Sequence, residues 1–299
     1  TGAFENGHTK PDIDQAYLDG FADLYNDALK SDISSDERAL FARAMHLPDV
    51  STIVQARENA DPVAAYNARQ YLLAAIKRTH KPLLQKLYKG NEQNGAFSVS
   101  PDAMARRALH NAALSILTAT HGTGCAKLAK EHYIHADNMT DRMAALMAIA
   151  PNKSPEREEV LENFYTRYKD YQLVVDKWFS VQATSARPDI IAHLQKLRQH
   201  PDFTIKNPNR VRSLFAAFAM NNPASFHAQD GSGYNFLADA IIELNTINPQ
   251  IAARLLTPMR DWRKYSLDRR EKMKAALERI LEAPGLSPDV FEIASKSLK

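Results

Sequence analysis

Apolar residues recur along this chain at intervals of three and four positions, the spacing that places side chains on one face of an α-helix. Four stretches show the pattern clearly, and each predicts an amphipathic helix with one buried face. The apolar stripes are Ala105, Leu109, Ala112, Ala113, Ile116 and Leu117; Val160, Leu161, Phe164, Tyr165 and Tyr168; Ile190, Ile191, Leu194 and Leu197; and Met273, Ala276, Leu277, Ile280 and Leu281.

Prolines predict where several helices begin. A proline costs about 3 kcal/mol inside a helix but is tolerated at the first helical position, where its missing N–H is not needed. Seven of the fifteen prolines follow Ser, Asn or Asp, the residues that cap helix N-termini at a gain of roughly 1 kcal/mol. These seven pairs are Asp61-Pro62, Ser100-Pro101, Ser154-Pro155, Asn207-Pro208, Asn222-Pro223, Asn248-Pro249 and Ser287-Pro288.

The pattern as a whole predicts an all-α fold. Ten glycines in 299 residues is less than half of the usual share of about 7%, and alternating β-branched runs are almost absent. The predicted starts are tens of residues apart, which favours a superhelical array of antiparallel helix pairs, a HEAT-like or TPR-like α-solenoid with a curved or ring-like form. Phe97–Val99 and Phe203–Ile205 are the only candidates for extended structure, and both fit a loop equally well.

Composition narrows the function classes. Hydrophobic residues make up 44% of the chain and charged residues 24%, and no apolar run approaches the roughly 18 residues of a membrane span. A net charge of +3 is too small to indicate a protein that binds the phosphate backbone of nucleic acid. A single cysteine, Cys125, fits a reducing compartment, so we expect a cytoplasmic protein. The chain opens at Thr1 without an initiator Met, and we expect an excised fragment of a larger protein.

Ten histidines raise the question of a metal site, but none is followed by Glu, so the His-Glu-x-x-His motif is absent. The nearest imitation is Glu131-His132-Tyr133-Ile134-His135, in which the two histidines are three residues apart and could share a helix face. The glutamate precedes them, on the wrong side for a general base. A solvated or hydrogen-bonded histidine pair is the favoured interpretation, and we predict no metal ligand and no catalytic residue in this chain.

Other motifs with chemical meaning are weak. Cys125 ends the run His121-Gly122-Thr123-Gly124-Cys125, which we interpret as a turn between helices. Asp230-Gly231-Ser232-Gly233-Tyr234 lacks the flanking strand of a phosphate-binding loop and is more simply a tight turn. The stretch from Arg260 to Lys274 holds seven basic residues interleaved with acids, which is typical of a solvated helix face. Trp178 and Trp262 are expected to be packing residues.

Two segments resemble the C-terminal domain of bacterial aminopeptidase N, an M1-type enzyme also called alanyl aminopeptidase. They are Asn207-Pro208-Asn209-Arg210-Val211-Arg212-Ser213-Leu214 and Asn222-Pro223-Ala224-Ser225-Phe226-His227-Ala228-Gln229-Asp230-Gly231-Ser232-Gly233-Tyr234. Supporting matches lie at residues 138–141, 176–179, 182–185 and 248–255. The resemblance covers the chain from about Asp36 onward and is thin before Ser100. Gln229 stands where the family carries an acidic residue.

The resemblance implies that residues 1–299 form a single all-α C-terminal domain, with the first 35 or so residues least well matched. It also implies a parent enzyme that removes N-terminal residues from short peptides, with zinc held in a separate catalytic domain of the same polypeptide. This chain would then need no cofactor of its own. Its partners would be that catalytic domain and the peptide substrates. The helical domain itself would cap the active site and exclude water.

Carried over residue by residue, Arg212, Gln250 and Arg254 match family positions that face the substrate cavity or channel. Gln250 and Arg254 are four residues apart on one predicted helix and share a face. Two guanidinium groups there would attract the C-terminal carboxylate of a peptide. The alternative is that both arginines form salt bridges or are solvated on a helix surface.

Two other functions stay open at this stage. A stand-alone α-solenoid adaptor would bind a protein or peptide on its concave face. Its surface would be polar, whereas a domain excised from a larger protein should expose a large apolar interface. An autonomous hydrolase that uses His132 and His135 is a more remote alternative.

Overall fold

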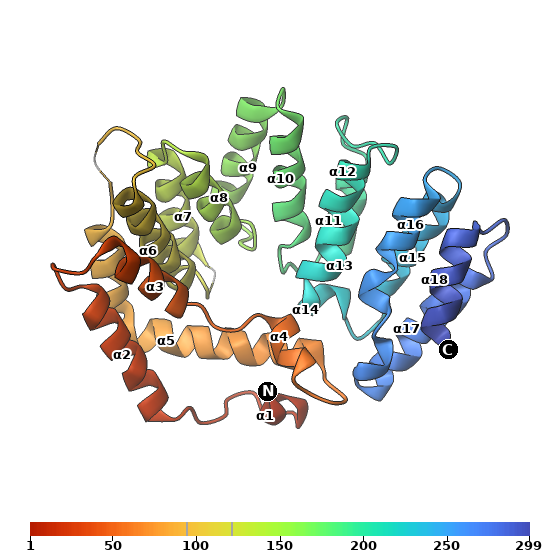
Figure 1. The fold of residues 1–299 in the computed structure, drawn as a ribbon, viewed down its shortest axis with the longest axis horizontal. Coiled ribbons are helices and arrows are strands. Elements are labelled where there is room, and N and C mark those ends of the chain that lie inside the picture. The colour runs from red at the N-terminus through yellow and green to blue at the C-terminus, as the bar shows by residue number, and fades with distance from the viewer. Residues whose placement is uncertain (94, 121) are drawn as a thin grey trace. The chain divides into compact units, whose positions relative to one another are not determined.

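The computed structural model describes residues 1–93, 95–120 and 122–299, and no strand occurs in these ranges. The described chain is helical, as predicted, and divides into two compact units. Unit 1 contains residues 1–49 and 67–164, and unit 2 contains residues 50–66 and 165–299. Figure 1 shows the helices of both units, coloured along the chain. The prediction of one domain over residues 1–299 stays a prediction.

Unit 1 is built from helices that pack on one another in pairs, most of them close in sequence. Contacts join α2 with α3, α3 with α6 and α7 with α8, around a core that includes Tyr25, Ile76 and Leu109. Residues 62–66 of α5 and 165–168 of α9 belong to unit 2. The helices are α1 (Gly2–Glu5), α2 (Gln15–Ala28), α3 (Ser35–Ala44), α5 (Pro62–Gly90), α6 (Pro101–Leu117), α7 (Thr123–His135), α8 (Met139–Ile149) and α9 (Pro155–Tyr168).

Unit 2 repeats this packing with shorter helices. Helices α15 and α16 are joined by a short loop and pack together, as do α17 and α18 (Figure 1). The elements are α4 (Val50–Gln55), α10 (Gln172–Ala183), α11 (Ile190–Arg198), α12 (Pro208–Val211), the π-helical turn η1 (Arg212–Ala216), α13 (Ala217–Asn221), α14 (Pro223–Phe226), α15 (Ser232–Asn245), α16 (Pro249–Leu255), the 3₁₀ turns η2 (Thr257–Met259) and η3 (Trp262–Lys264), α17 (Leu267–Leu281) and α18 (Pro288–Leu298).

The prolines that follow Ser, Asn or Asp predict helix starts correctly. All seven prolines that follow Ser, Asn or Asp are the first residue of a helix. Six of the seven preceding side chains accept a backbone N–H of the new helix, for example Asp61 from Val63 at 2.8 Å and Asn248 from Ile251 at 3.1 Å. The expected cap at Asn222 is wrong, because its amide instead donates to the carbonyls of Ala183 and Ser185.

One proline lies inside a helix and explains a local distortion. Pro82 lies within α5, and His80, two residues earlier, has non-helical angles of φ −115° and ψ 18°. A proline removes one helical hydrogen bond and its ring displaces the preceding turn, so a kink at this point is expected. The buried imidazole of His80 bonds the carbonyl oxygen of Leu18 at 2.9 Å, which ties the kink to α2.

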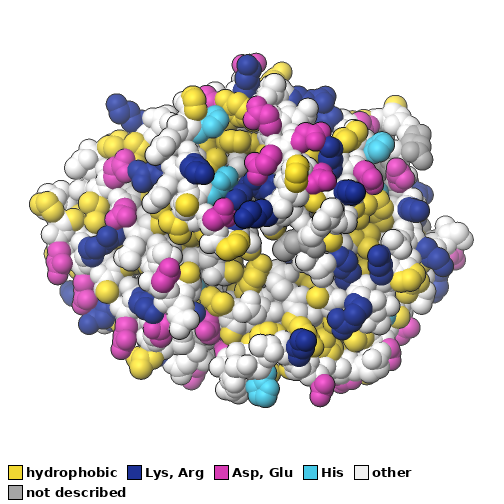
Figure 2. All heavy atoms as spheres, turned by 180° about the vertical axis from the view of Figure 1, so that it is seen from behind, with side chains coloured by type: hydrophobic (Ala, Val, Ile, Leu, Met, Phe, Trp, Pro, Cys, Tyr) yellow, Lys and Arg dark blue, Asp and Glu magenta, His cyan; other side chains and the backbone are white. Residues whose placement is uncertain are grey.

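The four predicted amphipathic stripes lie in α6, α9, α11 and α17, and the two tryptophans are buried as expected. Phe97–Val99 and Phe203–Ile205 are irregular segments and not strands. The fold class is therefore confirmed as antiparallel helix pairs, while the curved or ring-like form stays a prediction. No described helix combines the length and apolarity that crossing a bilayer requires. On the face drawn in Figure 2, basic and acidic side chains are intermingled.

Candidate functional site

Residues 207–221 of unit 2 form a helix that is interrupted by one π-helical turn. The Asn207 side chain caps its start by accepting the N–H groups of Asn209 at 2.9 Å and Arg210 at 3.4 Å. Helix α12 then passes into η1 at Arg212, and the Ser213 hydroxyl donates to the carbonyl oxygen of Arg210 at 2.9 Å. Single π-helical turns are rare and are often found at functional sites, which makes this segment a candidate site.

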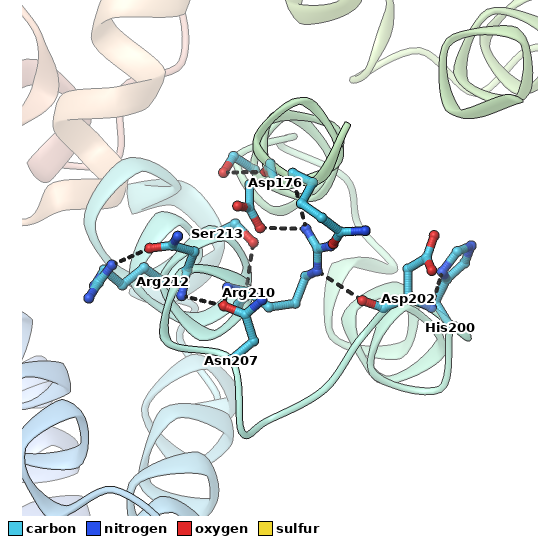
Figure 3. Close-up of polar contacts among 10 residues, drawn as sticks. Asp176, His200, Asp202, Asn207, Arg210, Arg212 and Ser213 are labelled. Atoms are coloured by element: carbon cyan, nitrogen blue, oxygen red, sulfur yellow. Dashed lines mark hydrogen bonds and ion pairs between the residues drawn. The ribbon is translucent and has the colours of Figure 1, made fainter. Parts of the chain in front are cut away.

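Arg210 anchors the segment from inside the protein, with 1% of its surface exposed. Its guanidinium donates to the carbonyl oxygen of Asp202 at 2.9 Å, to the side-chain oxygen of Gln172 at 2.7 Å, and to the carboxylate of Asp176. It also lies over the ring of Phe179, 5.1 Å from the centroid. Figure 3 shows these bonds radiating from Arg210. A buried guanidinium is tolerated only when paired in this way, so Arg210 fixes α12 against α10.

Arg212 lies two residues further on and points away from the Arg210 cluster in Figure 3. It is exposed, and its guanidinium donates to the side-chain oxygen of Asn209 at 2.6 Å. That acceptor is neutral, so the bond orients the guanidinium without compensating its positive charge. The structure therefore presents Arg212 as a positioned cation at the surface of the π-helical turn.

Gln250 and Arg254 lie on α16, the helix that begins at Pro249 as predicted. Both side chains are exposed, and their spacing of four residues puts them on one face. Among the described residues, neither side chain has a hydrogen-bond or ion-pair partner, and no polar contact joins either one to Arg212. The salt-bridge alternative considered for the arginines thus finds no carboxylate partner in the described part of the chain.

The second resembling segment, Asn222–Tyr234, is a packing motif. Asn222 is buried and bonds the carbonyl oxygens of Ala183 at 3.1 Å and Ser185 at 2.9 Å. Gly233 lies so close to Phe226 that an added Cβ would approach the Phe226 carbonyl oxygen to 2.3 Å. The tight turn predicted at residues 230–234 is present at its start, where Gly231 has φ +73° and the Ser232 N–H donates to the Asp230 carboxylate at 2.9 Å. Gly233 and Tyr234 already belong to α15.

His227 in this motif is buried and was not singled out from the sequence. Its Nδ1 lies 2.8 Å from the Tyr234 hydroxyl oxygen. Burial, helped by the charge of Arg269, lowers the pKa of His227 to about 3, and burial also raises the pKa of the Tyr234 hydroxyl. The pair is therefore neutral over the physiological pH range, which suits a structural role.

The two histidines of the sequence Glu131-His132-Tyr133-Ile134-His135 differ in their exposure to solvent. His132 is 5% exposed, stacks on His110 with ring centroids 4.7 Å apart, and places Nδ1 2.9 Å from the Tyr88 hydroxyl oxygen. His135 is exposed and bonds the carbonyl oxygen of Glu131. Each ring is hydrogen-bonded, as the favoured interpretation expected, but to a different partner, and only the His132 ring is buried.

The stacked rings of Tyr88, His110 and His132 lie beside a cavity of about 940 Å³ in unit 1. Burial lowers the pKa of His132 to about 4, and its Nε2 atom is buried without a hydrogen-bond partner. Within residues 1–93, 95–120 and 122–299, no three His, Cys, Asp or Glu side chains are grouped as metal ligands. Tyr88, His110 and His132 therefore do not offer the ligand set that a zinc ion needs.

The turn expected at residues 121–125 is wrong from Thr123 onward. Helix α7 begins at Thr123 with Gly122 at its N-cap, so Gly124 and Cys125 are helical, while His121 lies outside the described residues. The buried Cys125 sulfur lies 3.2 Å from the Lys77 ammonium. The basic stretch from Arg260 to Lys274 is likewise not one solvated face, since it is divided between η3 and α17 and its Arg269 is buried.

Comparisons with known proteins agree with this description. Residues 6–299 match a family model described as "Domain of unknown function (DUF3458_C) ARM repeats". Aminopeptidase N of Caulobacter vibrioides is 40% identical over 286 residues, which is 95% of this chain and 33% of that protein. Aminopeptidase N of Escherichia coli is 37% identical over 260 residues, 87% of this chain and 30% of that protein.

A solved structure is also similar. The crystal structure of Legionella pneumophila aminopeptidase A in complex with aspartic acid matches with a TM-score of 0.82 and 26% sequence identity. The match covers 96% of this chain and 34% of that one, so the chain spans about a third of the length of these relatives. The resemblance to aminopeptidase N noted in the sequence is confirmed, and the chain belongs to the DUF3458_C family of helical ARM-repeat domains.

Proposed function

We propose that this chain is the non-catalytic C-terminal domain of an M1-type zinc aminopeptidase and that it caps the active site of a catalytic domain in the same polypeptide. The observation that carries the proposal is the match to aminopeptidase N along 95% of this chain but only 33% of the relative. Such a match favours a domain of an aminopeptidase over a stand-alone adaptor. Zinc and the peptide-bond chemistry would belong to the catalytic domain.

Exposed apolar side chains in unit 2 support a covering role. Tyr171, Leu173 and Met220 are 63%, 69% and 59% exposed. Contiguous patches of large apolar side chains left in water, unlike single ones, mark surfaces that other parts of a protein cover. An adaptor that functions alone would be expected to keep such positions polar.

The role proposed for Arg212, Gln250 and Arg254 is to line the substrate cavity and to attract the C-terminal carboxylate of a peptide. Neither guanidinium has a carboxylate partner among the described residues, so both charges are available to a ligand. A guanidinium binds a carboxylate through two parallel hydrogen bonds, and Gln250 would add a neutral donor on the same helix face as Arg254.

Kinetics of the full-length enzyme test this role. Arg212→Ala and Arg254→Ala should each raise KM for tri- and tetrapeptides by roughly tenfold, because each removes a charge-assisted hydrogen bond to the peptide carboxylate. KM for small chromogenic aminoacyl substrates, which lack that carboxylate, should stay within about twofold. Lys274→Ala, which also removes one exposed cation from unit 2, is the matched control. Equal changes for both substrate types would refute the proposal.

A further inference from the structure

Part of the basic stretch that begins at Arg260 lines an open cleft in unit 2, which we call the basic cleft. Its charged lining residues are Arg57, Arg263, Lys264, Arg270 and one acid, Glu58. Asn59 also lines the cleft, and the volume is about 570 Å³. One wall is the segment after α4, and the other is formed by η3 and the start of α17. The cleft therefore carries four cationic side chains against one acid.

The two walls are held together by backbone hydrogen bonds. The Ala60 N–H donates to the Lys264 carbonyl oxygen at 3.0 Å, and the Ser266 N–H donates to the Ala60 carbonyl oxygen at 2.9 Å. These bonds form the one β-bridge in the described residues, between Ala60 and Tyr265. Main-chain hydrogen bonds therefore join the two walls of the cleft.

Arg263 is held in place by neutral groups. Its guanidinium donates to the carbonyl oxygens of Ser297 at 2.8 Å and Leu298 at 2.6 Å, and it stacks over the Trp262 ring, 4.2 Å from the centroid. A guanidinium has five N–H donors, so several remain for a ligand. None of these partners carries a negative charge, so the positive charge of Arg263 is oriented but not compensated.

Arg270 is fixed in the same manner. Its Nε donates to the carbonyl oxygen of Tyr265 at 2.6 Å, and a terminal nitrogen donates to the side-chain oxygen of Asn59. Asn59 is the only described non-glycine residue with positive φ, at 51°, a conformation that Asn tolerates better than most residues. Lys264 has one carboxylate neighbour, Asp261 at 3.3 Å, and both side chains of that pair are more than half exposed, so the pair is weak.

Other basic residues of the same stretch are neutralised. Arg269 lies 3.6 Å from a carboxylate oxygen of Asp61 and 3.3 Å from one of Asp268, and Lys272 lies 2.6 Å from Asp268. Acidic partners are thus available along α17, but among the described residues they form ion pairs with Arg269 and Lys272 and none with Arg263 or Arg270. Like charges that outnumber the nearby acids repel one another, and an anionic ligand would relieve that repulsion.

We propose that the basic cleft binds a small anion that carries two or more phosphate groups. Phosphate matches the fork of a guanidinium, and its tetrahedral oxygens accept hydrogen bonds from several directions, which suits donors on two opposing walls. A planar carboxylate accepts within one plane and would engage one wall well and the other poorly. The volume lies within the range of about 300–1,000 Å³ that is typical of small-ligand sites. This site is independent of the role proposed for Arg212 and Arg254.

Isothermal titration calorimetry of the 299-residue chain with inorganic tripolyphosphate at low salt tests the proposal. One saturable site is expected, with affinity that falls as salt is added, because the cleft is open to solvent. Arg263→Gln and Arg270→Gln should each weaken binding at least about tenfold, since each removes charge-assisted hydrogen bonds. Lys264→Gln, an exposed change that leaves the packing intact, should weaken it about threefold.

Arg260→Gln removes one exposed cation that does not line the cleft, and it should change the affinity less than about twofold. Urea midpoints followed by tryptophan fluorescence would show that each variant is folded. Citrate, a carboxylate anion of comparable charge, should bind at least about fivefold more weakly than tripolyphosphate. Absence of saturable binding, equal losses for Arg260→Gln and Arg263→Gln, or equally tight citrate binding would each overturn the proposal.

Discussion

Replacement of the buried Arg210 tests whether this one side chain fixes the segment that carries Arg212. In Arg210→Ala, the carboxylate of Asp176 would lose its guanidinium partner although only 16% of that side chain is exposed. The Gln172 side chain and the Asp202 carbonyl would each lose a donor. Removal of one member of a buried ion pair costs about 3–5 kcal/mol, because the remaining charge stays buried without compensation. The loss is a large fraction of the 5–15 kcal/mol that stabilises a typical domain.

Urea unfolding followed by tryptophan fluorescence measures this loss in the appropriate unit. The chain has two tryptophans, Trp178 and Trp262, and both are buried in unit 2 with Arg210. Arg210→Ala should lower the urea midpoint by at least about 1 M. Arg212→Ala, two residues away but exposed, should change the free energy of unfolding by less than about 0.5 kcal/mol. Equal midpoints for the two variants would refute the role given to Arg210.

Three further changes have expected outcomes in the same unfolding assay. Gly233→Ala should destabilise by about 1–3 kcal/mol, because its Cβ would collide with the Phe226 carbonyl oxygen; an unchanged midpoint would contradict that close approach. Asn207→Ala should cost about 1 kcal/mol through loss of the helix cap. The folded-state pKa of His227 is about 3 against 6.5 unperturbed, so the unfolded state binds more protons between these values. The contribution of His227 to the free energy of unfolding is complete above about pH 6.5 and is lost as the pH falls toward 3. His227→Gln should flatten this pH dependence, and the control His135→Gln, at an exposed histidine, should leave it unchanged.

The helix starts could be predicted from the sequence because the interactions that set them are local. A proline and the capping residue before it act within one turn, and all seven predicted starts are present. The cap at Asn222 failed because its side chain bonds carbonyls of residues 183 and 185, which are distant in sequence. The π-helical turn at Arg212 has no local sequence signal that we recognised.

The candidate site was predictable only in part. The shared face of Gln250 and Arg254 follows from their spacing, and both side chains are exposed as a site requires. Whether a charge is compensated depends on tertiary contacts that spacing does not encode. Arg269 finds Asp61 from a distant part of the chain, whereas the nearby Arg263 finds only carbonyl oxygens. The cavity-facing role of Arg212, Gln250 and Arg254 comes from the family resemblance alone and stays a prediction.

The most direct test of the central claim is a peptidase assay of the 299-residue chain with alanine and arginine aminoacyl fluorophores, together with analysis of bound zinc in the same sample. A non-catalytic domain should show no turnover and no stoichiometric zinc, and the parent enzyme should show both. Turnover by the isolated chain with bound zinc would contradict the account and would direct attention to His132 and its neighbours in unit 1.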